Sequence, residues 1–359
     1  MEKDSIEEHG FANVRRSFNW SSRLLKCMGI WPLKNYLPLF LFFFIYLFLH
    51  ISLTVANLIW SPKTMDIVIM SVAENMEQMM TLTKITIARI NRDELRKLFI
   101  ELKEYSLTEK YETKEQKLTF VNYTKLPPYF IVIIAFSMSM AELIYYLTRV
   151  AEGIQIGKQN NSMGYELPYK TIDIVDLSDG RIYVIAQFAI LSYKVKTLLN
   201  NSKNYHEGMK NIVLRHYRLI RLSEKLEDIF NFPIMQLLLG STIHICVSGY
   251  YLLMGPEMTD ILTSLLFVFY MFSVTGTLFV YCFIGECFIQ ESTKFGNAIY
   301  NYEWYNLPAM DAKFFLICMI RTKKPQYLTS GKFAVLSLTV FTDIIKTSMG
   351  YLSVLRTFA

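Results

Sequence analysis

Long apolar stretches limit what this chain can fold into more than any other feature of its sequence. The clearest runs from Tyr36 to Trp60, and Trp31 and Trp60 near its ends are typical interfacial anchors. A helix needs roughly 20 mainly apolar residues to cross a bilayer, because the hydrocarbon core is about 30 Å thick and each residue adds about 1.5 Å. Seven stretches meet this requirement. The sequence therefore predicts an all-α integral membrane protein with seven transmembrane helices.

The predicted spans differ in how apolar they are. The second carries Glu74, Glu77 and Lys84, so we expect it to be shielded inside the bundle, and the third is expected to open at Pro127. A further apolar segment, Ala312 to Ile320, is too short to cross and is predicted to be a cytoplasmic or re-entrant helix. The seven spans are predicted at residues 36–60, 65–87, 127–147, 172–199, 233–254, 261–284 and 333–355.

The connections between the spans alternate between a basic set and a nearly neutral set. The basic set holds 29 Lys and Arg and consists of residues 1–34, 89–126, 194–232 and 285–332. The other set holds 4 and consists of residues 61–66, 151–171, 255–260 and 356–359. Because basic connections stay on the cytoplasmic side, we predict a cytoplasmic N-terminus and an extracellular C-terminus. The charged opening MEKDSIEEHG has no apolar core, so we expect the first span, not a cleaved signal peptide, to direct insertion.

The long cytoplasmic connections are helix-prone and mixed in charge, which indicates that the spans continue as helices into the cytoplasm, where subunits could meet. Asn160 heads a glycosylation sequon on the predicted outer face. The chain is divided into a cytoplasmic N-terminal segment, helices 1 to 6 with their cytoplasmic extensions, a cytoplasmic connection with a short helix, and a last helix with a short extracellular tail, at residues 1–34, 35–284, 285–332 and 333–359.

Motifs of catalysis and metal binding are missing from the sequence. The five histidines form no HExxH pattern, the five cysteines form no CxxC pattern, and neither GxSxG nor a glycine-rich phosphate loop occurs. We therefore expect no enzyme, no metal and no cofactor. The formal charge of +6 is explained by membrane topology and does not indicate a nucleic-acid partner.

Three acids in the predicted spans, Glu74, Glu77 and Glu142, fit an ion or proton relay or, alternatively, polar contacts inside the bundle. Aromatic, Met and aliphatic residues at helical spacing also fit an apolar pocket for a small volatile ligand, although ordinary helix packing gives the same pattern. The candidate ligand-binding residues are Phe136, Met140, Leu143, Tyr183, Gln187, Tyr270 and Val274.

One face of the last span combines small, aromatic and aliphatic residues at i, i+3, i+4, i+7 and i+11. Such a face could line a pore that closes by a hydrophobic constriction, or it could pack within the bundle. Its members are Thr347, Gly350, Tyr351, Val354 and Phe358.

The C-terminal motifs resemble those of insect odorant receptors. The stretch GECFIQESTKFGNAIYNYEWYNLP, residues 285–308, is similar to the family signature after the sixth helix, and residues 319–356 are similar to the family ending. The resemblance implies a tetrameric, ligand-gated cation channel in the plasma membrane of a sensory dendrite, opened by a small volatile odorant. It further implies that the last helix lines the pore, that Val354 is the gate, and that the odorant pocket lies in the outer half of each subunit.

The short connection at 200–232 differs from the long insertion of the family's co-receptor. The chain therefore resembles a tuning subunit that forms a heterotetramer with that co-receptor. The related gustatory receptors end in Thr-Tyr and, after five residues, Gln-Phe, whereas this chain keeps Tyr351 and Phe358 but has Gly350 and Thr357 at the other two places. A gustatory-type channel is thus the nearest alternative. A G-protein-coupled receptor, which needs an outward N-terminus, and a transporter, which would use the intramembrane acids, are the others.

Overall fold

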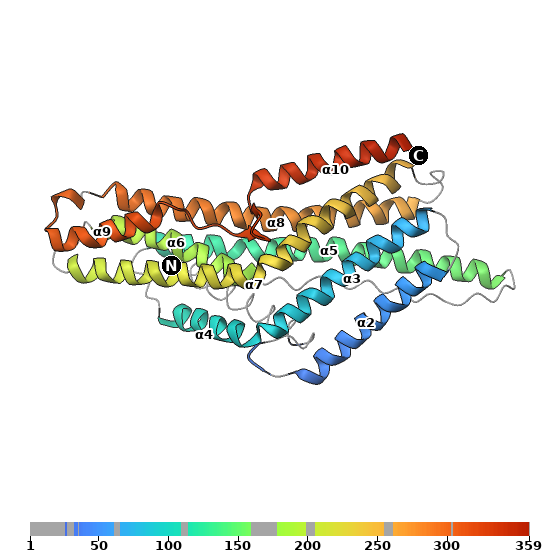
Figure 1. Ribbon diagram of the computed structural model, residues 1–359, viewed down its shortest axis with the longest axis horizontal. Coiled ribbons are helices and arrows are strands. Elements are labelled where there is room, and N and C mark those ends of the chain that lie inside the picture. Colours follow the sequence, from blue (N-terminus) through green and yellow to red (C-terminus); the bar gives the residue numbers. More distant parts are fainter. Residues whose placement is uncertain are drawn as a thin grey trace, which may run out of the picture.

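The computed structural model is a bundle of long helices (Figure 1). It describes residues 26, 32–34, 36–60, 65–108, 114–158, 178–198, 205–254, 261–302 and 304–358. The elements in these ranges are α2 (Leu37–Trp60), α3 (Met65–Ile90), α4 (Arg92–Thr108), α5 (Lys114–Lys158), α6 (Ser178–Leu198), α7 (Tyr205–Met254), α8 (Ile261–Tyr300), the 3-10 turn η2 (Trp304–Asn306), α9 (Ala309–Thr322), β1 (Thr329–Ser330), β2 (Ala334–Val335) and α10 (Leu338–Phe358).

The helices run along the long axis of the molecule, so their ends collect at its two extremities (Figure 1). The ends next to the weakly charged connections, Trp60, Lys158, Met254 and the end of α10, lie toward the right. Helix α9, α4 and the ends of α7 and α8 that belong to the basic connections lie toward the left (Figure 1). The described helix ends are therefore separated in the way that the predicted two sides require.

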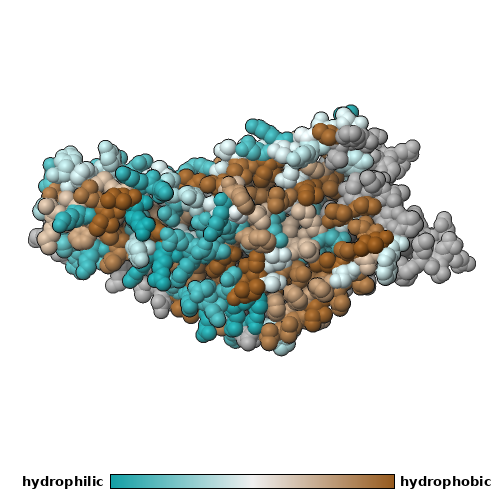
Figure 2. All heavy atoms as spheres, viewed as in Figure 1, coloured by the Kyte–Doolittle hydropathy of each residue, from teal (hydrophilic) through white to brown (hydrophobic). Residues whose placement is uncertain are grey.

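The surface divides in the same way (Figure 2). Hydrophobic side chains dominate the right half, and hydrophilic side chains gather left of the centre. Among the described residues, three helices are long and apolar enough to cross a membrane by length and composition, at Leu37–Trp60, His206–Leu253 and Ser264–Asn306, and a shorter apolar helix occupies Val132–Ile144. A helical membrane protein is therefore confirmed, while spans in α3, α5, α6 and α10 remain predictions.

The core forms where α5, α6, α7 and α8 pack against one another, and α10, α3 and α2 are added around it. Helix α6 is enclosed by α5, α7 and α8, and its residues from Arg181 to Ser192 are buried except for Tyr183. A helix buried on all sides has no polar face, and accordingly the stretch from Ile182 to Leu191 is apolar apart from Tyr183 and Gln187, while the charged residues lie near the two ends of α6.

Several predicted boundaries change in the structure. Helix α5 begins at Lys114 and passes through Pro127, and α7 likewise passes through Pro233, so neither proline opens a helix. A proline removes one backbone hydrogen bond, but neighbouring helices can hold the segment in helical form on both sides of it. Helix α8 continues to Tyr300, so the predicted boundary at residue 284 falls inside one helix. These three helices confirm that the spans continue as helices, while the cytoplasmic location of the extensions remains a prediction.

The last helix starts later than predicted, at Leu338 instead of residue 333. Residues Thr329 to Val335 form a two-stranded antiparallel hairpin, in which Gly331 and Lys332 adopt positive φ angles of 59° and 62°. A helix cannot continue through a left-handed turn. Hydropathy alone counts Phe333 to Leu336 with the helix because they are apolar. The predicted short helix at Ala312 to Ile320 is confirmed as α9, which packs on α7 and α8.

Candidate pore helix and ligand site

The start of α10 is fixed to the rest of the bundle by hydrogen bonds from the hairpin to α7. The carbonyl oxygen of Asn231 accepts a hydrogen bond from the Gly331 N–H at 3.3 Å, and its side-chain Oδ1 accepts one from the Lys332 N–H at 3.0 Å. One helical turn earlier, Glu227 Oε1 accepts a hydrogen bond from Thr329 Oγ1 at 2.6 Å. The hairpin therefore sets the place at which α10 leaves the core.

Helix α8 holds the same segment from the other side. Gly285 lies so close to Leu336 that an added Cβ would stand 2.5 Å from both the Leu336 Cβ and its carbonyl oxygen. Next to it, Glu286 Oε2 accepts a hydrogen bond from the Leu338 N–H, the first of α10, at 3.4 Å. Gly285 allows the close approach of α8 to Leu336, and the Glu286 carboxylate accepts a hydrogen bond from a free N–H group at the start of α10. These two roles explain why a glycine and a glutamate occur together here.

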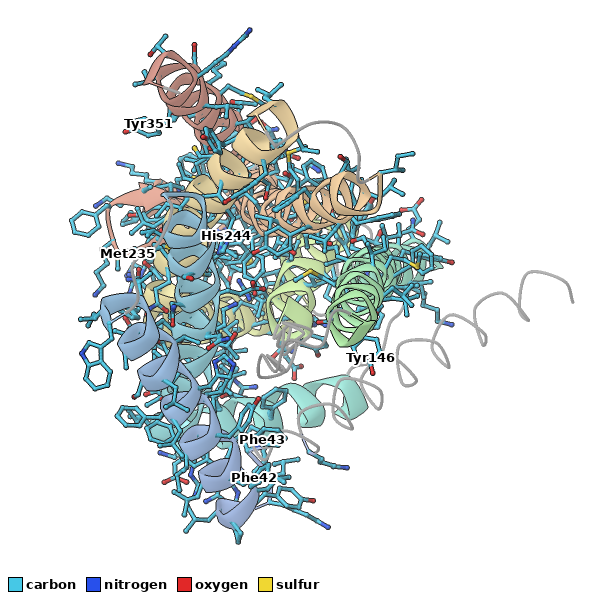
Figure 3. The ribbon with its side chains drawn as sticks, turned by 90° about the vertical axis from the view of Figure 1, so that its right-hand side faces the viewer. Phe42, Phe43, Tyr146, Met235, His244 and Tyr351 are labelled. Carbon is cyan, nitrogen blue, oxygen red and sulfur yellow. The ribbon has the colours of Figure 1, made fainter. Side chains whose placement is uncertain are left out.

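Helix α10 has a packed face and an exposed face. Ser348 and Leu352 are buried against α7, where Ser348 O accepts a hydrogen bond from Cys246 Sγ at 3.3 Å and Leu352 lies against Gly249. On the other side, Tyr351 is 58% exposed and Val354 is 53% exposed. Figure 3 likewise places Tyr351 on the outside of α10.

The exposed face is the one that the sequence spacing selected. Thr347 and Gly350 are exposed together with Tyr351 and Val354, and no atom lies within 4 Å of a Cβ added at Gly350. Phe358 belongs to α10, but its side chain is not among those described. These residues face away from their own subunit, so the packed-bundle alternative does not hold within one chain.

A polar cluster joins three helices in the outer half of the bundle. The hydroxyl of Tyr270 on α8 donates a hydrogen bond to Glu77 Oε2 on α3 at 3.0 Å. The Tyr270 hydroxyl oxygen also lies 2.9 Å from His244 Nδ1 on α7. Tyr270 is 8% exposed and His244 is 4% exposed. Figure 3 places His244 among the helices, away from the surface. Sequence reasoning selected Tyr270 and Glu77 but missed His244, although a histidine within an apolar stretch is itself a signal.

The seven predicted ligand residues do not line one cavity. Phe136 and Leu143 on α5 are 63% and 51% exposed, so they point away from the bundle. Tyr183 packs on Phe120 in the inner half of α5, at a ring distance of 6.0 Å, and Gln187 accepts a hydrogen bond from Arg215. The neighbours of Tyr183 and Gln187 thus belong to segments that are predicted to be cytoplasmic.

Distances along the helices explain this separation. Arg181, two residues before Tyr183, stacks over Tyr281 with a distance of 4.7 Å to the ring centroid. Tyr281 follows Tyr270 by eleven residues on α8, which corresponds to roughly 16 Å of helix rise. Tyr270 and Val274 therefore lie in the outer half, with Met140 partly buried on α5, while the α6 candidates lie further in. Helical phase cannot reveal such differences in height between helices.

Three further residues were singled out by the sequence: two acids of the predicted spans and the asparagine of the sequon. Glu142 is partly buried on α5, whereas the side chain of Glu74 is not among those described. Asn160 lies outside the described residues. Among the described residues, no group of three or more His, Cys, Asp or Glu side chains is placed to hold a metal ion.

Comparison with known proteins agrees with the C-terminal motifs. A family model described as a 7tm odorant receptor matches residues 181–349, from the start of α6 to the middle of α10. Odorant receptor 13a of Drosophila melanogaster is 28% identical over 194 residues, which cover 48% of this chain and 46% of that protein. The segment from residue 181 to residue 349 is therefore similar to odorant receptors.

A second odorant receptor shows a similar extent of similarity to this chain. Odorant receptor 85b of Drosophila melanogaster is 28% identical over 169 residues, which cover 44% of this chain and 43% of that protein. The chain thus matches less than half the length of these relatives. The olfactory receptor OR5 of the insect Machilis hrabei, solved in complex with eugenol, shares the fold, with a TM-score of 0.77 over 97% of this chain and 100% of that chain at 13% identity.

Much of the odorant receptor signature now has a structural reason. Gly285 and Glu286 hold the start of α10, and Ser292 Oγ accepts a hydrogen bond from the Gln326 N–H at 3.0 Å in the segment that leads there. Gly331 turns the hairpin. These residues of the signature therefore position the last helix.

The half of the bundle that is predicted to be cytoplasmic holds a buried histidine. His216 on α7 is 4% exposed and contacts the ring of Phe295 at a centroid distance of 4.6 Å. Burial lowers the pKa of His216 from 6.5 to about 4, and the charge of Arg321 acts in the same direction. His216 is therefore neutral at physiological pH and serves as an aromatic packing residue.

Proposed function

We propose that this chain is a subunit of a ligand-gated, non-selective cation channel that opens when a small volatile molecule binds. The observation that carries the proposal is the exposed face of α10, because Thr347, Gly350, Tyr351 and Val354 turn away from the subunit while Leu352 is buried in it. A helix with a free small and apolar face can line a pore at an axis shared by several copies.

The proposed assembly is a tetramer in the plasma membrane, formed with an odorant receptor co-receptor. The support is the short connection at 200–232, which lacks the long insertion expected of a co-receptor. Val354 is the proposed gate and Thr347, Gly350, Tyr351 and Phe358 are the other proposed pore residues. An odorant opens the channel if it binds the open state more tightly than the closed state, since only differential affinity shifts the equilibrium.

The gate is tested by current recordings from cells that express this chain with the co-receptor. We expect Val354→Ala to raise the basal current, because it widens the constriction, and Val354→Trp to block the odorant-evoked current at normal surface expression. Met349 is the matched control: it is 51% exposed, close to the 53% of Val354, but lies roughly 140° around the helix. Equal effects at Met349 and Val354 would remove Val354 from the pore.

The proposed odorant site surrounds the polar cluster in the outer half. Tyr270, which bonds to both Glu77 and His244, supplies a hydroxyl in an otherwise apolar setting, with Val274 one turn away. Such a setting suits a small organic ligand with one polar group. The eugenol bound to the Machilis hrabei receptor is consistent with a ligand of this size.

The site is tested by dose–response curves for an activating odorant. We expect Tyr270→Phe and Val274→Ala to shift the half-maximal concentration by about tenfold, which is the effect of roughly 1.4 kcal/mol in binding. Tyr183→Phe is the control, because that hydroxyl belongs to the inner half. A shift at Tyr183 without one at Tyr270 would place the ligand elsewhere.

A further inference from the structure

A cavity of about 730 Å³ lies between the inner parts of α5, α6 and α8, away from both the exposed face of α10 and the cluster around Tyr270. Its volume is within the range of small-molecule sites, roughly 300–1,000 Å³. Most of its lining belongs to the predicted cytoplasmic segments 89–126 and 285–332. The residues that matter for recognition are Tyr123, Ser192, Tyr193, Glu291, Asn297 and Tyr302.

Glu291 lines this cavity with a carboxylate of which only one oxygen accepts hydrogen bonds from described residues. The residue is 4% exposed, and its Oε1 accepts hydrogen bonds from Tyr123 Oη at 2.8 Å and from Lys294 Nζ at 2.6 Å. Within the part of the chain that the structure describes, Glu291 Oε2 accepts none. An ionised carboxylate can accept about four hydrogen bonds, so this oxygen is available to a ligand.

Both hydrogen-bond donors of Glu291 bind its Oε1 atom and leave Oε2 for a ligand. Burial and the bond to Glu291 raise the pKa of Tyr123 far above its usual range, so Tyr123 stays a donor. The side chain of Lys294 is 61% exposed, and an ion pair with so exposed a partner contributes little. A second cation that reaches Glu291 Oε2 is therefore favoured.

The rest of the cavity fits an aromatic body. Phe283, Tyr193 and Tyr302 line it, and Tyr302 is held in place by stacking on Phe315 of α9 at a centroid distance of 4.6 Å. Aromatic faces attract organic cations as well as apolar groups. The amide of Asn297 adds a donor and an acceptor at the wall.

We propose that this cavity is a second ligand site, on the cytoplasmic side, which binds a small aryl-alkyl ammonium ion with its charge on Glu291 Oε2 and its ring among the tyrosines. Only the cytoplasmic placement rests on the proposed function, because it uses the predicted topology. Binding itself is independent of channel activity.

The test is saturable binding of labelled phenethylamine to the detergent-solubilised receptor at neutral pH. We expect wild-type binding to be weakened at least tenfold by Glu291→Gln, which removes the charge. Asp228→Asn is the matched control, because Asp228 is an exposed carboxylate on α7 outside the cavity, and it should leave binding unchanged. Phenethyl alcohol, which has the same ring and chain without the charge, should compete at least tenfold more weakly.

A second variant tests the cavity independently, in case Glu291→Gln fails to fold. Ser192 is 8% exposed at the cavity wall, and Ser192→Trp fills the space and should abolish phenethylamine binding while the odorant-evoked current persists. Binding that is absent in the wild type, or equal in wild type and Ser192→Trp, would overturn the proposal. Absence of any odorant-evoked current in the wild type would instead reject the proposed channel function and would not affect the binding result.

Discussion

Three glycines on α8 provide a graded test of how closely this helix packs against its neighbours. A Cβ at Gly276 would meet Ile134 Cγ1 at 3.6 Å, an ordinary contact. A Cβ at Gly296 would meet Thr322 Cβ at 3.1 Å, and a Cβ at Gly285 would meet the Leu336 carbonyl oxygen at 2.5 Å. Each Gly→Ala change gains about 1 kcal/mol of helix preference, so the differences between them isolate the steric cost.

The steric cost at Gly285 should be large, because two of the three nearest atoms belong to the backbone and cannot rotate away. Overpacking of this kind costs about 1–3 kcal/mol, and we expect the upper part of that range. Gly285→Ala should therefore be destabilised by about 2 kcal/mol net, Gly296→Ala should be near neutral, and Gly276→Ala should gain up to about 1 kcal/mol.

Thermal unfolding of the purified receptor in one detergent, followed by fluorescence-detected size exclusion, measures this order. We expect the apparent Tm of Gly285→Ala to fall by several degrees and that of Gly276→Ala to stay or rise. If Gly285→Ala were as stable as Gly276→Ala, the close approach of α8 to Leu336 would be wrong. The proposed way in which α10 is held would then be wrong as well.

Three further changes test separate contacts. Leu352→Ala should cost about 2–3 kcal/mol, because it opens a gap beside Gly249, whereas the exposed Ser353→Ala should not change the Tm. Glu286→Ala should cost about 1 kcal/mol by removing the acceptor for the Leu338 N–H, and Glu286→Gln should retain most of it. His216 has a folded pKa of about 4, below its unfolded value of 6.5, so stability should fall by up to roughly 3 kcal/mol as pH drops through this window. His216→Phe should flatten that dependence in thermal unfolding from pH 4 to 7, and an unchanged slope would exclude His216 as its source.

The sequence by itself determined that the protein is a helical membrane protein, that its basic connections alternate with nearly neutral ones, and which residues of the last helix share a face; only the structure shows that this face is exposed. The spans and their orientation depend on the apolar and basic residues of each local stretch, because each stretch interacts with the membrane directly. The face of Thr347, Gly350, Tyr351 and Val354 could be predicted because residues of one helix keep a fixed angular relation. The C-terminal motifs predicted the similarity to odorant receptors because their residues are contiguous in the chain.

Tertiary structure decided which helices meet and at what height. The late start of α10 depends on the left-handed turn at Gly331 and Lys332, which apolarity conceals. The pairing of Tyr270 with His244, and of Tyr123 with Glu291, joins residues up to 168 positions apart. Helical periodicity gives the direction of a side chain but not the register between two helices, so the sites between helices emerge only when the bundle is packed.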